Sequence, residues 1–339
     1  MGLKLSILDQ SPIGEQETAE EAFRNTVELA KKAEQLGYHR FWVSEHHDSE
    51  YLAGSSPEVL IAYLLAHTQR IRIGSGGVML QHYSPYKVVE NFNVLSALAP
   101  GRVDLGIGSA PGGFPRSTKA LRQGSEPNAK PLEAKLIELE QYLHKRVPEE
   151  HPLYGVKASP LPQKPPELYL LGTSISSAQL AAKTGIPYVF AQFINGDEAV
   201  IQEALLAYRS QFVSDGRSEP QALMAVSVIV TETDEEAEEL WLAADSKHVK
   251  IHLESGRTIN VKTLESAEEY GRQADEKYTV EVKDSPIIHG SKHAVRQQLL
   301  ELQERYGLDE LIVSLSMKGF SRRLRAYELL QEAFSEQPV

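Results

Sequence analysis

Short apolar runs, rich in β-branched residues, alternate along the chain with longer stretches whose apolar positions recur every three or four residues. The short runs are typical of buried strands, and the longer stretches of amphipathic helices. This alternation predicts βαβ units and a parallel sheet, and eight such units predict a closed (β/α)8 barrel, or TIM barrel. The expected strands are Lys4–Leu8, Arg40–Ser44, Arg72–Ser75, Val103–Ile107, Leu168–Leu171, Tyr188–Ala191, Met224–Val230 and Glu310–Ser314.

Helix boundaries fit this register. Thr18-x-x-Glu21 has the form of a capping box, and Ser84-Pro85 places a cap before a proline at the first helical position. Gly37 is expected to end the first helix just before a strand. A final helix, from about Ser321 to Phe334, is expected to close the barrel.

Two stretches exceed the bare repeat, and we expect insertions there, after strands four and seven. Residues 111–130 hold Arg116, Lys119, Arg122 and Lys130 against only Glu126, a cationic excess in an acidic chain. Residues 247–285 are too long for a plain connection and are expected to form an active-site insertion with some helix of its own. Residues 1–339 are otherwise predicted to form one barrel domain.

Composition narrows the classes of function. The 339 residues contain no cysteine, which excludes disulfides, thiolate nucleophiles and sulfur-ligated metals. A formal charge of −12 disfavours nucleic acid and anionic membranes as partners. With neither a signal sequence nor a long apolar run, the protein is expected in the cytoplasm.

The candidate chemistry lies just after the strands, because barrel active sites form at the carboxyl ends of the strands. Ser44-Glu45-His46-His47 follows strand two. Neighbouring strand residues point to opposite faces, so adjacent histidines are a poor joint metal site, and no metal is predicted. A lone acid, base or hydrogen-bond donor at the barrel mouth is the functional interpretation. Two histidines satisfied within a strand-end turn are the structural alternative.

Glycine-rich strand ends offer further candidates. Gly74-Ser75-Gly76-Gly77 would let a planar ring approach the main chain, although a bulge or a tight barrel bend explains it equally well. Gly106-x-Gly108 lacks the third glycine of a dinucleotide fingerprint, which excludes a Rossmann site. The run Gly172–Ser177 gathers hydroxyls and backbone N–H groups at a helix start near Ser176 or Ser177 and is the better phosphate candidate. Ser176-x-x-Gln179 has the form of a capping box, so a hydroxyl could instead serve the helix.

Taken together, these segments resemble the luciferase-like flavin monooxygenases, a family that includes bacterial luciferase. The similarity covers nearly the whole chain, with each motif in order at its strand end. It rests on Phe41–His47, Ile73–Leu80, Pro100–Gly108 and Leu170–Ser174, with Leu8–Pro12 and Ser109–Gly112 typical of small single-chain members.

The resemblance implies roles for individual residues. His46 matches the catalytic histidine, which assists formation or breakdown of a flavin peroxide. Gly76 and Gly77 match a pair joined by a non-prolyl cis peptide beside the flavin ring. The phosphate of FMN is expected at the turn that holds Gly172, Thr173, Ser174 and Ser177.

One position departs from the family pattern. Ser109 stands where the family often has an arginine that neutralises the flavin phosphate, and a hydroxyl supplies no charge. Arg116 or Arg122 is expected to replace that cation, unless FMN binds more weakly or the flavin differs.

The implied activity is a monooxygenase. Reduced FMN from a separate flavin reductase would react with O2 to a C4a-hydroperoxyflavin that oxygenates a small apolar substrate, with Tyr83, Phe114 and Phe193 as candidate pocket walls. Three alternatives remain: hydride transfer with F420, a non-catalytic flavin-binding subunit and, least favoured, a barrel metallohydrolase. A homodimer through the helices after strands two and three is expected by analogy.

Overall fold

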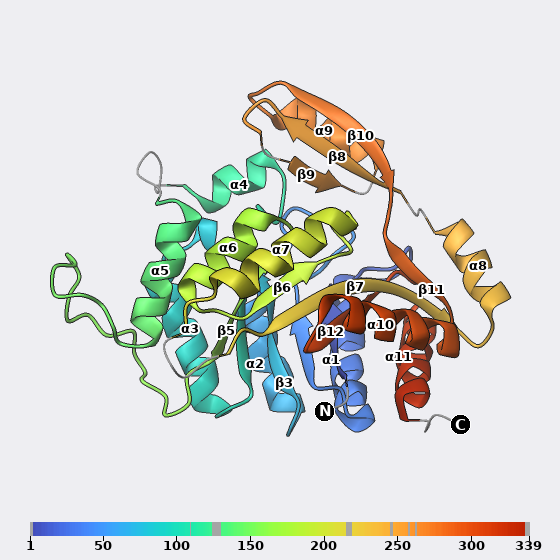
Figure 1. Cartoon of the computed structure of the whole chain (residues 1–339), viewed down its shortest axis with the longest axis horizontal. Helices are drawn as coiled ribbons and strands as arrows, with labels where there is room; N and C mark the ends of the chain where they lie inside the picture. The colour runs from blue at the N-terminus through green and yellow to red at the C-terminus, as the bar shows by residue number, and fades with distance from the viewer. Residues whose placement is uncertain are drawn as a thin grey trace.

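Eight parallel strands form a closed barrel in the computed structural model (Figure 1). The structure describes residues 3–108, 110–123, 130–214, 219–244, 247–256, 258–261 and 263–335. The strands follow the order β7-β12-β1-β2-β3-β4-β5-β6, and pairing of β6 with β7 closes the ring. They are β1 (Lys4–Asp9), β2 (Arg40–Val43), β3 (Arg72–Val78), β4 (Val103–Ile107), β5 (Glu167–Gly172), β6 (Tyr188–Ala191), β7 (Ala222–Thr231) and β12 (Glu310–Leu315). The predicted barrel is confirmed.

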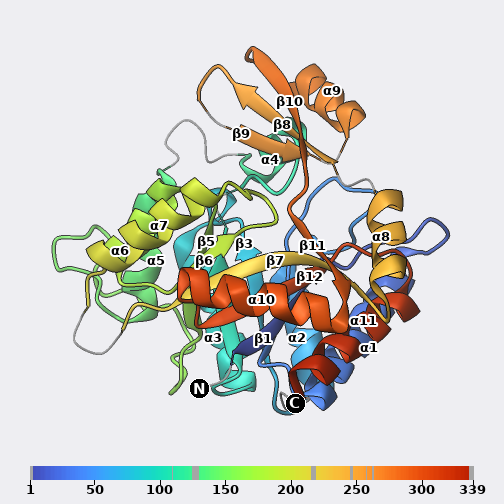
Figure 2. The same cartoon turned by 45° about the vertical axis from the view of Figure 1, so that its right-hand side comes forward.

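Helices surround the barrel in both views (Figure 2). They are α1 (Ala19–Leu36), α2 (Pro57–His67), α3 (Pro85–Leu98), α5 (Leu132–Leu143), α6 (Ile175–Thr184), α7 (Glu198–Gln211), α8 (Asp234–Ala243), α10 (Lys292–Tyr306) and α11 (Phe320–Ser335), with a 3-10 turn, η1 (Leu80–His82), before α3. The Thr18–Glu21 capping box and the left-handed Gly37 cap of α1 are present as expected. Within the described ranges, no helix combines the length and apolar character needed to cross a membrane.

Alternation along each strand builds two cores. One set of side chains, including Ile7, Phe41 and Val43, packs between the strands and the helices. The other set fills the barrel interior. It comprises Leu8, Trp42, Tyr169, Leu171, Val189, Leu223, Ala225 and Ile312. Because consecutive residues point to opposite faces, Ile7 and its neighbour Leu8 belong to different cores.

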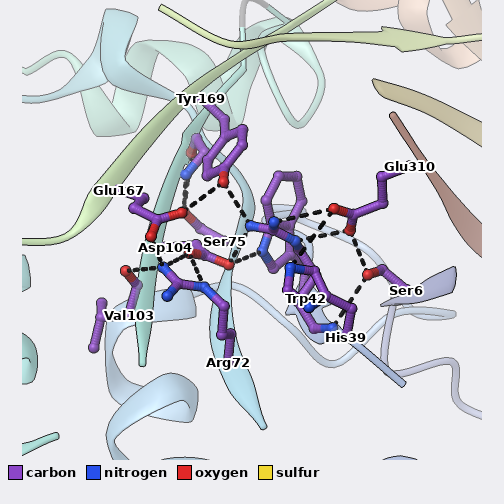
Figure 3. Close-up of polar contacts among 12 residues, drawn as sticks. Ser6, His39, Trp42, Arg72, Ser75, Val103, Asp104, Glu167, Tyr169 and Glu310 are labelled. Carbon is purple, nitrogen blue, oxygen red and sulfur yellow. Dashed lines mark hydrogen bonds and ion pairs between the residues drawn. The ribbon is translucent and has the colours of Figure 1, made fainter. Parts of the chain in front are cut away.

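The amino ends of the strands enclose a buried network of charges (Figure 3). Arg40 lies at its centre, with Nε 2.8 Å from Glu310 Oε1 and Nη1 2.9 Å from Asp104 Oδ2. Trp42 Nε1 also donates to Asp104, and Arg72 pairs with the same carboxylate from the next strand. Burial alone would lower the pKa of Arg40, but the two carboxylates raise it above its ordinary value. The network therefore fills one end of the barrel with paired charge.

The insertion after β4 contributes α4 (Pro115–Leu121). Phe114, its N-cap, lies edge-on to Tyr270 with 6.1 Å between ring centroids, and the Arg116 backbone N–H donates to Gln273 at 3.2 Å. Lys130 forms an ion pair with Glu138. The first insertion is thus packed against the second one.

The insertion after β7 is a small sheet, with strand order β10-β8-β9, covered on one face by a helix (Figure 1). Its elements are β8 (Lys247–Leu253), β9 (Thr258–Val261), α9 (Leu264–Gln273) and β10 (Tyr278–Asp284). The expected helix is present, but the three strands were not predicted. Their signal is the polar-apolar alternation His248-Val249-Lys250-Ile251, which a reading as loop and helix overlooks.

A further strand, β11 (Ile287–Ser291), returns the chain to the barrel beside β7. β7 pairs with β6 through Ala222–Ala225 and with β11 through Ser227–Thr231. Ser227 and Val228 also pair with β12, so β11 must occupy the same edge of β7 as β6. The insertion therefore leaves and rejoins the barrel at one place.

Candidate active site

His46 follows β2 at the carboxyl end of the barrel. Its backbone N–H donates to Gly54 at 2.8 Å, and its half-buried ring lies with Nδ1 3.0 Å from Ser44 Oγ. Ser44 is buried, so this contact fixes the orientation of the imidazole. Such a ring can hold or move a proton at Nε2 while Nδ1 is engaged. The structure places His46 where a mouth residue was expected, and its role stays a prediction.

The neighbouring His47 belongs to a different cluster. Its Nε2 lies 2.7 Å from Oε1 of the fully buried Glu45, which also accepts from Tyr83 Oη at 2.7 Å. Glu45 Oε2 accepts from the backbone N–H of Met79 at 2.9 Å. Burial and Glu45 together raise the pKa of Tyr83 well above its usual range. Sequence reasoning named Glu45 within the motif after strand two but gave it no role of its own. In the structure this carboxylate joins the ends of β2 and β3.

Gly76 and Gly77 are joined by a cis peptide, and the pairing of β3 with β4 is irregular between Gly76 and Val78. A Cβ on Gly76 would meet Leu8 at 2.8 Å, and one on Gly77 would meet the Gly106 carbonyl at 2.7 Å. The bulge considered for this segment is therefore present. Close packing against the backbone of β4 requires glycine at Gly77, whereas at Gly76 the nearest atom belongs to the flexible side chain of Leu8. Contact with a flavin ring stays a prediction.

Of the two arginines offered as phosphate partners, Arg122 uses its guanidinium in other contacts, whereas Arg116 is held through its backbone N–H. Arg122 donates from Nε to His82 Nδ1 at 3.2 Å and from Nη2 to Gln81 at 2.7 Å. His82 Nε2 lies 2.7 Å from the Pro111 carbonyl, so His82 ties the start of this insertion to η1. Ser109, the position that departs from the family pattern, lies outside the described residues.

The helix start that follows β5 differs from the expectation. Ser174, not Ser176, is the N-cap of α6: its Oγ accepts from the Ser177 N–H, and Ser177 Oγ completes the box at the Ser174 N–H. Ser177 Oγ also lies 2.8 Å from the hydroxyl of Tyr188. The capping box predicted at Ser176-x-x-Gln179 is therefore wrong, because α6 begins at Ile175. Both hydroxyls named as phosphate contacts hold the helix start in place.

Gly172 allows this helix to begin so close to the sheet. A Cβ there would meet Ser177 Oγ at 2.2 Å, so no other residue fits without displacing α6. Thr173, next along, accepts from Asn195 Nδ2 through its carbonyl at 3.0 Å. The first-turn N–H groups of a helix favour an anion, and hydroxyls add donors. Because the cap uses the hydroxyls of Ser174 and Ser177, a phosphate at this turn would rely first on the N–H groups of the helix start, and its binding there stays a prediction.

The three aromatic side chains offered as pocket walls lie in different clusters. Phe193 packs on the barrel interior, beside the group that contains Leu8 and Trp42. Tyr83 packs against the outer core, and Phe114 against the insertion sheet. Packing explains each of them, and a pocket role stays a prediction.

Gln192, directly after β6, was missed by sequence reasoning. Its Oε1 is buried and has no hydrogen-bond partner in the part of the chain that the structure describes. A buried acceptor of this kind costs about 1–3 kcal/mol unless a ligand or water donates to it. The barrel mouth thus contains a hydrogen-bond acceptor that a ligand with an N–H or O–H donor would satisfy.

Comparison with known proteins decides the family. The sequence model of the luciferase-like monooxygenases matches residues 3–309. The chain belongs to the luciferase-like monooxygenase family. Family membership makes it an oxidoreductase, and the resemblance expected from the sequence is confirmed.

Two relatives and one solved structure are similar to this chain over nearly its whole length. It is 44% identical to N-acetyl-S-alkylcysteine monooxygenase of Bacillus subtilis, over 98% of both chains. It is 35% identical to a luciferase-like monooxygenase of Escherichia coli K12, again over 98% of both chains. The crystal structure of apo-MsnO8 has a TM-score of 0.79 at 35% identity and covers 99% of each chain.

Proposed function

We propose that this luciferase-like monooxygenase uses reduced FMN, delivered by a separate flavin reductase, and O2 to oxygenate a small organic substrate. The observation that carries the proposal is the 44% identity, over nearly all of both chains, to a monooxygenase. The donor set at the start of α6 supports an FMN phosphate there.

Separate strand ends would bind the flavin and move the proton. The turn Gly172–Ser177 would hold the phosphate, and Gly76-Gly77 would present backbone to the ring. Bound reduced flavin supplies the electrons that activate O2. His46, oriented by Ser44, would donate or accept a proton at Nε2. The insertion above the barrel would exclude water from the mouth.

The substrate proposal follows the same relative. The name of that enzyme describes N-acetylated cysteines alkylated on sulfur, and we propose that this protein oxygenates a related thioether. The largely apolar top of the barrel interior, with Leu8, Leu171 and Phe193, suits an alkyl substituent on sulfur.

The test is a binding titration with FMN, reduced FMN and F420, first without oxygen and then after O2 is added. Tight binding of reduced FMN, followed by oxygenation of N-acetyl-S-methylcysteine with a reductase present, supports the proposal. Binding of F420 alone, without oxygen chemistry, would assign hydride transfer. Flavin binding without any turnover would assign a non-catalytic subunit.

We also propose that two copies associate through α2 and α3. Four large apolar side chains are exposed there: Val59 at 68%, Tyr63 at 56%, Val94 at 45% and Leu98 at 72%. Exposed apolar side chains grouped on neighbouring helices are typical of interfaces. A dimer mass by light scattering, and a monomer mass for Leu98→Asp, is the expected result.

A further inference from the structure

One face of the insertion sheet carries basic and polar side chains. Val249, Ile251 and Leu253 of β8 pack toward α9. The alternate residues His248, Lys250 and His252 therefore lie on the opposite face. Pairing with β10 places Lys283 beside His248 and Glu281 beside Lys250 on that face.

On this face the acidic residue forms ion pairs, whereas one of the lysines does not. Glu281 is already paired, with Lys283 and His252 each at 3.1 Å. Lys250 is half-buried and has no hydrogen-bond or ion-pair partner among the described residues. Burial, followed by the charge of Lys283, lowers the pKa of Lys250. Glu281 and Asp197 act on Lys250 through their charge, but neither forms an ion pair with it among the described residues. A half-buried ammonium in this state favours a further anion.

His248 adds a second unsatisfied group beside Lys250. Its buried Nε2 lacks a partner in the described ranges, while Nδ1 lies 3.5 Å from Ser285 Oγ. Burial, and then Lys250 and Lys283, lowers the pKa of His248, which favours the neutral ring with one N–H to donate. An ammonium and an imidazole N–H on the same face of one strand offer two donors to the two oxygens of a carboxylate.

The same face lies next to the barrel mouth. Asp197, the N-cap of α7, is close enough for its charge to act on Lys250. A Cβ on Gly196 would meet the Pro286 ring at 2.6 Å, so the loop after β6 touches the end of the insertion. That loop begins with Gln192, whose amide oxygen has no donor among the residues that the structure describes.

We propose that Lys250 and His248 bind a carboxylate on the substrate and so select anionic substrates for the barrel mouth. This inference rests on the proposed monooxygenase function, since it assigns a specificity site to that reaction. The flavin phosphate is the other possible anion, but the start of α6 already offers it a donor set.

The experiment compares N-acetyl-S-methylcysteine with its carboxamide, which lacks the charge, by calorimetry on the FMN-loaded protein. The wild-type protein is expected to bind the acid roughly tenfold more tightly than the amide, as one charge-assisted hydrogen bond allows. Lys250→Gln should bind both compounds alike. Lys247→Gln removes the same charge from the α9 side of the same strand and should keep the preference.

Three results would overturn the inference. They are equal binding of acid and amide by the wild-type protein, a preserved preference in Lys250→Gln, and a loss of FMN affinity in Lys250→Gln as large as the loss for the acid. The last result would assign the anion to the flavin. Turnover is measured separately: a preserved acid preference without oxygenation supports the binding site and contradicts the proposed function.

Discussion

At the scale of single residues, we expect substitution of His46 to affect turnover and substitution of its neighbour His47 to affect stability. His46→Ala removes a half-buried ring that touches Ser44, so turnover should fall roughly 100-fold while stability changes little. His47→Ala leaves the buried Glu45 with one fewer donor and should lower stability instead. Reductase-coupled product formation and thermal unfolding separate the two effects. Unchanged turnover in His46→Ala would remove His46 from the mechanism.

The serines of α6 make a second prediction at this scale. Ser174→Ala with Ser177→Ala should weaken FMN more than riboflavin, because only FMN carries the phosphate. The variant also loses a helix cap, at about 1 kcal/mol. Thr233→Ala, which removes the side-chain cap of α8, is the control for that loss and should leave FMN affinity unchanged. Equal weakening of both flavins would contradict the phosphate assignment.

At the scale of elements, His82 links the insertion after β4 to η1 in a way that depends on pH. Burial is the main cause that lowers the pKa of His82 from 6.5, and Arg122 adds to it against Glu45 and the Pro111 carbonyl. The contact of His82 with the insertion after β4 is therefore fully stabilising above about pH 6.5 and is lost as the pH falls. The reason is that His82 binds a proton more readily when the insertion is detached from η1 than when it is attached. Hydrogen-exchange protection of residues 111–122 should fall between pH 7.5 and 5.5, relative to α7. In His82→Gln this pH dependence should disappear.

Elements also show how far the sequence could lead. The eight barrel strands were predictable because each is a distinct apolar run, and the ends of β2, β3 and β5 bring His46, Gly76-Gly77 and Ser174 to one end of the barrel. The strands of the second insertion were overlooked because β8 alternates over only a few residues inside a polar stretch. The start of α6 was misplaced because Ser174, Ser176 and Ser177 are all good caps, and only the backbone decides among them.

At the scale of the whole molecule, the buried charges at the amino ends of the strands make a stability prediction. These ion pairs join residues that are distant in sequence, such as Arg40 and Glu310, so no local sequence pattern predicts the pairs. Arg40→Met leaves Glu310 and Asp104 without a central cation and should lower the free energy of unfolding by about 3–5 kcal/mol. Arg325→Met, in an exposed cluster, should cost less than about 1 kcal/mol. Denaturant unfolding measures both, and equal effects would contradict the role of the buried network.

The pairing of Thr231 with Ser291 has a consequence for how such proteins diversify. The two ends of the segment between them lie side by side, one on β7 and the other on β11, so a change in the length or sequence of the intervening insertion leaves the closure of the barrel unaltered. The insertion, which we propose binds the carboxylate of the substrate, can then vary in evolution. The strand ends that would hold the flavin are kept. Transplanting this segment from a relative, with Thr231 and Ser291 retained as the junctions, is thus a natural route to altered selectivity.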